Sequence, residues 1–183
     1  MSIGRSVNRA ALIALAFAPV AGALRAQRLE FVGAGGGVVV PTGSFGDVDK
    51  AGWHVAALAV GRLKRSVHFT VDALYAQTSH QGGVSGSSTL AGGSVGAALF
   101  LGPDTRGLRP YVSAGAGVFR VNVSVPGFGS AAATRLVPTF GAGVTVGTGR
   151  RRGFVAVRYV SVGTSPQKTS FIPISAGLIF TLQ

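Results

Sequence analysis

A serine and a glycine-rich stretch are the first places in this chain to look for chemistry. Gly92-Gly-Ser-Val-Gly96 has the Gly-x-Ser-x-Gly form of a serine nucleophile, but that chemistry needs a sharp turn from a strand into a helix. Ser94 lies instead within an alternating, strand-like segment. Gly33-Ala-Gly-Gly-Gly37 is reminiscent of a phosphate loop, but valines follow it where a helix would have to begin. We therefore expect no catalytic serine and no nucleotide cofactor.

The titratable side chains do not predict a metal site. His54, His68 and His80 lack metal-ligand spacing on any one element. Asp47 and Asp49 would supply only two of the roughly six to eight oxygen ligands that Ca²⁺ takes. The sequence therefore predicts no bound metal.

Four charged or titratable residues remain as candidates for a buried polar network. His68 and Asp72 are four residues apart on one face of a strand-like segment. Glu30 begins the first such segment of the chain, and Arg158 lies in the middle of the seventh. Whether these side chains meet depends on the elements that position them.

The composition is that of a membrane protein without a spanning helix. Charged residues make up 12% of the 183-residue chain and the mean hydropathy is +0.46, whereas about a quarter of a soluble domain is charged. No run of 18 apolar residues follows residue 24. Because only helices and closed barrels satisfy every backbone group in lipid, a barrel is expected. The chain has no cysteine, which excludes disulfides and thiolate metal sites.

Residues 1–26 have the organisation of a secretory signal peptide. A positively charged N-terminal region with Arg5 and Arg9 precedes an apolar core, Ala10–Leu24. Cleavage fits after Ala23 or after Ala26, and we prefer Ala26. The sequence thus predicts a signal peptide followed by one domain at 27–183.

Eight strand-like segments follow, each near the ~9–11 residues that a tilted membrane strand needs. No stretch between them has a sustained helical period. The segments are Leu29–Val40, Trp53–Leu63, Val67–Thr78, Leu90–Leu101, Pro110–Val121, Arg135–Gly147, Gly153–Thr164 and Phe171–Leu182.

The last segment alternates as a wall between lipid and a narrow polar lumen would. Its odd-numbered face is small or polar except at Phe171 and Ile179. The third, fourth and sixth segments alternate clearly too, whereas the first two are ambiguous. Glycines in the first segment would relieve crowding in the lumen. The continuous apolar face of the last segment comprises Ile172, Ile174, Ala176, Leu178, Phe180 and Leu182.

The connections between the segments alternate in character. The first, third and fifth, at 41–52, 79–89 and 122–134, are long, and the second, fourth and sixth are shorter and basic. Basic turns can meet lipid phosphates, and a plain solvated turn explains them equally well. Because these residues are divided among three turns without interleaved aromatics, they do not predict nucleic-acid binding. They are Lys64, Arg65, Arg106, Arg109, Arg150, Arg151 and Arg152.

The chain resembles the small bacterial outer-membrane β-barrel proteins of the OmpA/OmpX kind. The resemblance lies in the predicted signal peptide, the eight strand-like segments, the alternation of long and short connections, and the last segment. The glycine-rich first segment running into Val40-Pro-Thr-Gly-Ser-Phe45 is similar to this family too. The resemblance implies an all-β fold, an eight-stranded antiparallel up-and-down transmembrane β-barrel preceded by a signal peptide. It also implies an outer-membrane location, with the long connections at the outer end of the barrel and the basic turns at the periplasmic end. The terminal strand would be read by the assembly machinery, with Phe180 and Leu182 as the assembly signal. The family usually ends on the aromatic residue, whereas three residues follow Phe180 here.

In such a barrel, a charge at membrane depth must face the lumen and be paired. We therefore expect Glu30, His68, Asp72 and Arg158 to form an ion-pair network, with Arg158 bound to Glu30, Asp72 or both. A lumen filled by side chains implies a non-catalytic barrel with a structural or surface-interaction role.

Two other functions remain open. A lipid A-modifying barrel enzyme would need a histidine and a serine together on the outward face. A soluble periplasmic lipocalin-like carrier would have large apolar side chains pointing inward around a cavity. For the main interpretation, the expected partners are outer-membrane lipid and lipopolysaccharide, periplasmic chaperones and the barrel assembly machinery. We expect a monomer that uses no cofactor and binds no nucleic acid.

Overall fold

The computed structural model describes residues 29–182 apart from 44–45, 47–48, 81–85, 104–106, 126, 128 and 165–166. The predicted signal peptide and the predicted domain start at residue 27 lie outside the described residues. In the described part of the chain, no helix is long and apolar enough to cross a membrane.

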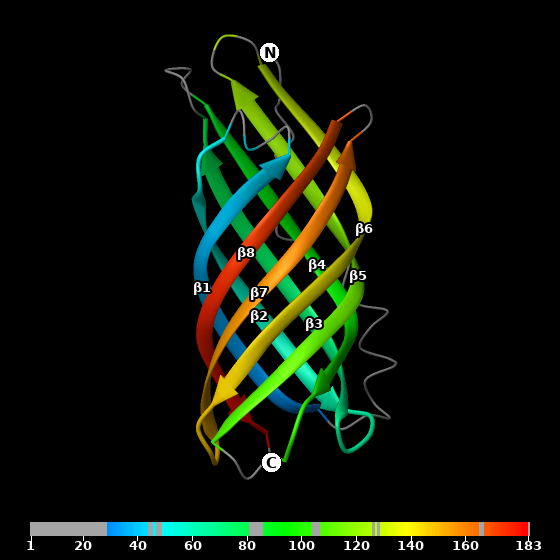
Figure 1. Ribbon diagram of the computed structural model, residues 1–183. Helices are drawn as coiled ribbons and strands as arrows, with labels where there is room; N and C mark the ends of the chain where they lie inside the picture. Colours follow the sequence, from blue (N-terminus) through cyan, green and yellow to red (C-terminus); the bar gives the residue numbers. More distant parts are fainter. Residues whose placement is uncertain are drawn as a thin grey trace, which may run out of the picture.

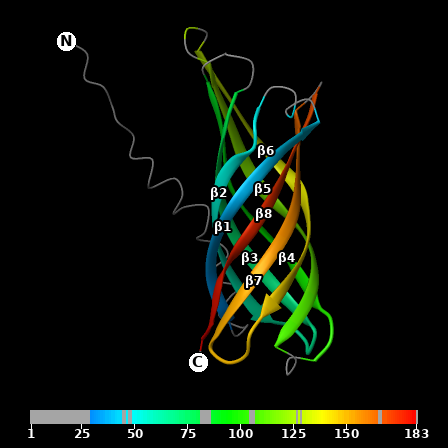
Figure 2. The same ribbon diagram turned by 60° about the vertical axis from the view of Figure 1, so that its left-hand side comes forward.

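The described residues form eight strands that close into one antiparallel barrel (Figure 1; Figure 2). Each strand pairs with its neighbours in the sequence, and the last strand pairs with the first. The predicted up-and-down barrel is confirmed. The strands are β1 (Leu29–Gly43), β2 (Gly52–Arg62), β3 (Val67–Ser79), β4 (Ser87–Phe100), β5 (Leu108–Val125), β6 (Gly129–Val146), β7 (Arg151–Thr164) and β8 (Gln167–Thr181).

The two ends of the barrel carry different connections. The connections after β2, β4 and β6 lie at the end where β1 begins and β8 ends, at the bottom of Figure 1, which we call the turn end. The connections after β1, β3, β5 and β7 lie at the opposite end, which we call the loop end. The predicted separation of the connections between two ends is therefore correct.

The fifth connection is much shorter than the sequence predicted. Instead of a loop over 122–134, β5 and β6 continue to pair as far as Val125↔Gly129. Gly127, in the turn between the two strands, has a φ of 84°, a backbone conformation that favours glycine. The alternating run Val121-Asn-Val-Ser-Val125 explains the difference, since alternation of this kind sustains a strand beyond the barrel wall.

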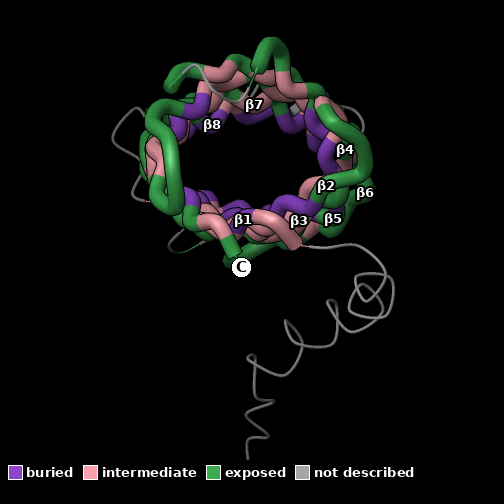
Figure 3. Tube along the Cα trace, turned by 90° about the horizontal axis from the view of Figure 1, so that it is seen from below, coloured by how far each residue is buried: buried purple, intermediate pink, exposed green. Residues whose placement is uncertain are grey.

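Burial alternates where the strands form the barrel wall, with the buried residues on the inner side of the tube (Figure 3). In β8, Ile179 is 7% exposed and Leu178 is 53% exposed, so the apolar face predicted to meet lipid does point outward. The structure also resolves the ambiguous first strand, where Val39 is fully buried and Val38 is exposed. In β2, His54 is buried and Val55 is exposed.

The lumen toward the loop end is apolar, which corrects the expectation of a polar interior. An eight-stranded barrel is so narrow that inward side chains meet one another. Apolar side chains can fill such a space without leaving buried polar groups unpaired. This loop-end core consists of Val39, Leu74, Ala76, Leu90, Phe119, Val121, Val137, Val160, Val162 and Phe171.

Glycines on the inner wall make room for aromatic rings. Gly35 of β1 and Gly177 of β8 are cross-strand partners in the seam that closes the barrel. A Cβ atom on Gly35 would lie 2.8 Å from Cζ of Phe154, and one on Gly177 would lie 2.7 Å from Cε1 of the same ring. Phe154 therefore packs on bare backbone, which agrees with the predicted relief of crowding.

We expect Gly177→Val to destabilise the barrel by about 1–3 kcal/mol, because the new side chain would overpack the space taken by the Phe154 ring. Ala176→Val, on the adjacent outward and exposed residue, should change the free energy of unfolding by less than about 0.5 kcal/mol. Urea unfolding in lipid vesicles, followed by Trp53 fluorescence, measures both. Equal effects of the two substitutions would contradict the assigned faces of β8.

Candidate functional site

The middle of the lumen holds an ion pair between strands on different sides of the barrel. Arg158 of β7 donates from Nη1 to Oδ2 of Asp72 on β3 over 2.5 Å. Ser94, the cross-strand partner of Asp72 on β4, donates from Oγ to Oδ1 of Asp72 over 2.6 Å. Both carboxylate oxygens are thus bound and the charge of Asp72 is balanced. A buried carboxylate needs this kind of pairing.

A second cluster, at the turn end, joins Glu30 to two cationic or titratable side chains. Arg62 donates from Nε to Oε2 of Glu30 over 3.0 Å, and its Nη2 contacts Oε1. His68, which is 1% exposed, places Nε2 3.3 Å from Oε2 of Glu30. Glu30 is an extra residue in the β1–β2 ladder, because the register shifts between Leu29↔Gly61 and Phe31↔Val60. Such a bulge re-aims a side chain, and here it allows Glu30 to reach the inward-facing His68.

At the turn end, two aromatic rings lie under arginine side chains. Arg109 lies over the ring of Phe100 at 4.7 Å, and Arg152 lies over the ring of Phe31 at 5.4 Å. Cation–π contacts of this type are favourable even where water has access. These two arginines, predicted as part of the basic turns, therefore cover the lumen. Lys64, Arg65, Arg150 and Arg151 are exposed, and Arg106 lies outside the described residues.

A third cluster, at the loop end, fastens the β1–β2 connection to β3. Thr78 donates to Oδ2 of Asp49 over 2.7 Å. Nε2 of His80 lies 3.3 Å from Oδ1 of Asp49 and 3.5 Å from Oγ of Ser88. In a catalytic triad the carboxylate and the hydroxyl bind opposite nitrogens of the imidazole. Here both approach the same nitrogen, so the arrangement fits a structural clasp rather than a proton relay.

The remaining described histidine also points inward. Nε2 of His54 lies 2.8 Å from Oγ of Ser175, and His54 is 1% exposed. Among the described residues, the histidine–serine contacts therefore lie in the lumen or at the loop end. None is on the outward face, where a lipid-modifying site would require one.

The structure brings the four predicted network residues together as two pairs. Asp72 contacts Arg158, and Glu30 contacts His68. Sequence reasoning missed Arg62, because its reach to Glu30 depends on a bulge that leaves no mark in the sequence pattern. The proposed assembly residues, Phe180 and Leu182, are 41% and 40% exposed and face outward.

The comparisons with known proteins concern the fold. No protein-family model matches the sequence, and no curated protein is significantly similar to it. Three solved structures of similar fold are 15–20% identical to the chain. Neisserial surface protein A has a TM-score of 0.68 at 20% identity, with 83% of this chain and 96% of that chain covered. The N-terminal β-barrel domain of Pseudomonas aeruginosa OprF has a TM-score of 0.52 at 17% identity, with 84% and 98% covered.

Ail, the attachment invasion locus protein of Yersinia pestis, has a TM-score of 0.52 at 15% identity, with 84% of this chain and 100% of that chain covered. Together with the closed ladder of β1 to β8, these likenesses define the class. The chain has the fold of the small outer-membrane β-barrels.

We expect Arg158→Leu to destabilise the barrel by about 2–3 kcal/mol, because it leaves the carboxylate of Asp72 uncompensated. The loss should fall below the ~3–5 kcal/mol typical of a fully buried pair, since 29% of the Arg158 side chain is exposed. Adding Asp72→Asn should recover part of the loss, because the amide needs no counter-charge. Urea unfolding of Arg158→Leu, Asp72→Asn and the double variant measures the coupling free energy between the two side chains.

Arg151→Leu is the matched control, since Arg151 is an exposed arginine at the start of the same strand. It should leave the free energy of unfolding within about 0.5 kcal/mol of the unchanged protein. If Arg158→Leu increased stability, or if Asp72→Asn gave no recovery, the ion pair would not have the role assigned to it.

Proposed function

We propose that this chain is a non-catalytic outer-membrane β-barrel protein with a packed lumen and a structural or surface-interaction role. The observation that carries the proposal is the apolar belt on the outside of the closed barrel. Soluble monomers rarely expose so large a continuous apolar surface, whereas a barrel in lipid requires one. The belt includes Trp53, Val55, Val95, Leu99, Val112, Val118, Leu136, Phe140, Val155, Val157, Ile174, Leu178 and Phe180.

The aromatic residues of the belt support this placement. Trp53 and Tyr75 are both outward and exposed, and their ring centroids lie 5.7 Å apart toward the loop end. Tryptophan and tyrosine concentrate at membrane–water interfaces, where the ring meets hydrocarbon and the polar atom meets water. The belt also disfavours a soluble lipocalin-like carrier. Such a carrier would share the inward apolar side chains, but it would have a polar exterior.

The distribution of charge supports an orientation with the turn end in the periplasm. Exposed Lys64, Arg65, Arg150 and Arg151 would there face the phosphates of the inner leaflet. The loop end would face outward, and the extended β5–β6 hairpin would carry surface contacts. Its exposed arginines, Arg120 and Arg135, would meet the phosphates of lipopolysaccharide.

The closed ladder supports the proposed assembly and oligomeric state. Phe180 on the last strand and Leu182 just after it face outward, where the assembly machinery and periplasmic chaperones would meet them before closure. Once β8 has paired with β1, the barrel itself is closed, and open edges remain where β6 and β7 extend past their last mutual pair, Thr139↔Val160. Because the barrel itself is closed, we propose a monomer. The inward placement of the described histidine–serine contacts supports the absence of catalysis.

Cysteine labelling tests the location and the orientation, because the chain has no cysteine of its own. Ser130→Cys, exposed near the tip of the β5–β6 hairpin, should react with a membrane-impermeant maleimide on intact cells. Arg150→Cys, exposed at the turn end, should react only after the outer membrane is permeabilised. Labelling of Arg150→Cys on intact cells would indicate the orientation opposite to the one proposed. Recovery of the protein in the soluble periplasmic fraction would overturn the proposal.

The packed lumen predicts that the barrel conducts no ions. Phe119 and Phe171 are 0% and 2% exposed and lie in the apolar loop-end core. An apolar, tightly packed constriction excludes hydrated ions. The protein reconstituted in planar bilayers should therefore show no steady conductance above that of the lipid. Discrete channel openings that depend on protein insertion would contradict a closed lumen.

A further inference from the structure

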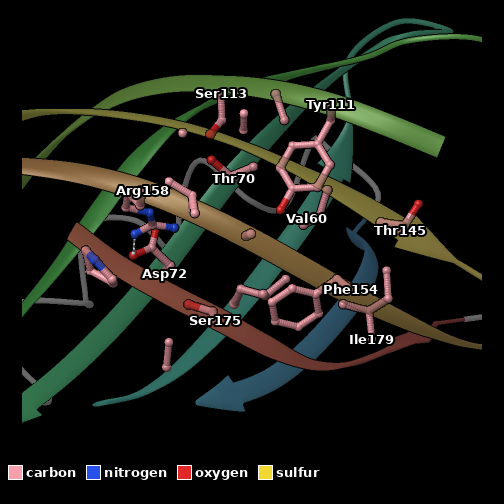
Figure 4. Close-up of a pocket in the computed structure, with 18 of the residues that line it drawn as sticks. Val60, Thr70, Asp72, Tyr111, Ser113, Thr145, Phe154, Arg158, Ser175 and Ile179 are labelled. Atoms are coloured by element: carbon pink, nitrogen blue, oxygen red, sulfur yellow. Dashed lines mark hydrogen bonds and ion pairs between the residues drawn. The ribbon is translucent and has the colours of Figure 1, made fainter. Parts of the chain in front are cut away.

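We propose that the lumen contains a binding site for a small, uncharged, mostly apolar molecule that carries one hydrogen-bonding group, as a phenol does. The site is a cavity of about 100 Å³ between the Asp72–Arg158 pair and the turn end (Figure 4). It lies below the apolar loop-end core, and the function proposed above does not use it.

The walls of the cavity set the chemistry of its occupant. Most of the lining is hydrocarbon, so water gains little by filling it, and a comparable engineered cavity of ~150 Å³ lined by Leu, Ile and Phe binds benzene. A volume of about 100 Å³ therefore suits one six-membered ring. The apolar walls include Phe31, Leu58, Val60, Phe100, Phe154 and Ile179.

Polar side chains interrupt the apolar lining in several places, at the Asp72–Arg158 pair and at Thr70, Tyr111, Ser113, Thr145 and Ser175, and the ion pair would orient the ligand. Figure 4 shows Arg158 and Asp72 together on one side, and Phe154 and Ile179 on another. A guanidinium has five N–H donors, and within the described residues Arg158 directs Nη1 to Asp72. Donors therefore remain for a ligand oxygen. The hydroxyl of Ser113 also lies on the lining.

The balance of charge selects an uncharged molecule. Asp72 neutralises Arg158, and its second carboxylate oxygen accepts a hydrogen bond from Ser94. An anionic or cationic ligand would therefore bring an uncompensated charge into an apolar space, which is strongly unfavourable. A hydroxyl group would accept a hydrogen bond from Arg158 and bring no charge.

A second, neighbouring cavity is suited to a water molecule rather than to an apolar ligand. It has a volume of only about 10 Å³ and is lined by Thr70, Asp72, Ser94, Ser113 and Thr139 among others. A polar space of that size holds about one water molecule. The two cavities thus differ in chemistry as well as in size: the small one is polar and the large one is mainly apolar.

Fluorine NMR of three probes tests the site on protein reconstituted in lipid nanodiscs, which avoids detergent tails that would compete for the cavity. Each sample is first shown to be folded by its heat-modifiable migration in SDS gels, so failure of the barrel in lipid is detected separately. 4-Fluorophenol should bind saturably above the level seen with empty nanodiscs. Fluorobenzene should bind about 10-fold more weakly, because it lacks the hydrogen bond to a charged donor. 4-Fluorobenzoate should not bind.

Two neighbouring alanines provide matched variants. Ala56→Leu fills the cavity that Ala56 lines and should reduce the affinity for 4-fluorophenol at least 10-fold. Ala57→Leu adds the same side chain on the exposed outer face and should leave the affinity unchanged. Absence of saturable 4-fluorophenol binding, or equal effects of the two substitutions, would overturn the proposal.

Asp72→Asn tests the role of charge. Removing the carboxylate leaves Arg158 uncompensated, so folded Asp72→Asn protein should bind 4-fluorobenzoate saturably, whereas the unchanged protein should not. If the unchanged protein bound 4-fluorobenzoate more tightly than 4-fluorophenol, the neutral Asp72–Arg158 pair would not select an uncharged ligand. If Asp72→Asn does not fold, the comparison of Ala56→Leu with Ala57→Leu decides the proposal.

Discussion

Hydrogen bonding between the first and last strands is the constraint on which the rest of this structure depends. β1 and β8 pair without a break from Phe31↔Thr181 to Gly43↔Thr169. Without this seam, two strand edges would expose unpaired backbone groups, which lipid cannot satisfy. The seam also determines local composition, because the paired glycines at 35 and 177 leave the space that the Phe154 ring occupies. The closing strands therefore serve the backbone ladder and the packing of the lumen together.

Because the closed barrel has a narrow lumen, its inward side chains pack against one another in separate polar and apolar levels along the barrel. The polar levels include Glu30 with Arg62 and His68, Asp72 with Arg158 and Ser94, His54 with Ser175, and Asp49 with Thr78 and His80. Between and above them lie hydrocarbon walls, which need no partners. A buried ion pair adds little net stability, although its disruption is costly. The Asp72–Arg158 pair here joins strands across the barrel and provides the charged groups on the cavity lining.

Local alternation predicted much of the fold, because a period of two identifies which residues share a face. It assigned the outward face of β8 correctly, with Leu178 exposed and Ile179 buried. It failed where a strand continued beyond the barrel, so that residues 122–134 became hairpin rather than loop. It also failed on the polarity of the lumen near the loop end, since Phe171, on the face expected to meet a polar lumen, lies in an apolar core.

By itself, the sequence determined the strand count, the sidedness of the connections and the apolar exterior, because each of these follows from composition and from spacing within one strand or turn. Only the tertiary structure decided which inward side chains meet. Arg158 and Asp72 are 86 residues apart in the chain, and Glu30 reaches His68 by way of a bulge in β1. These contacts, and the cavity beside them, depend on the stagger of strands around a closed barrel. That stagger is a property of all the strand pairs together, and no local pattern encodes it.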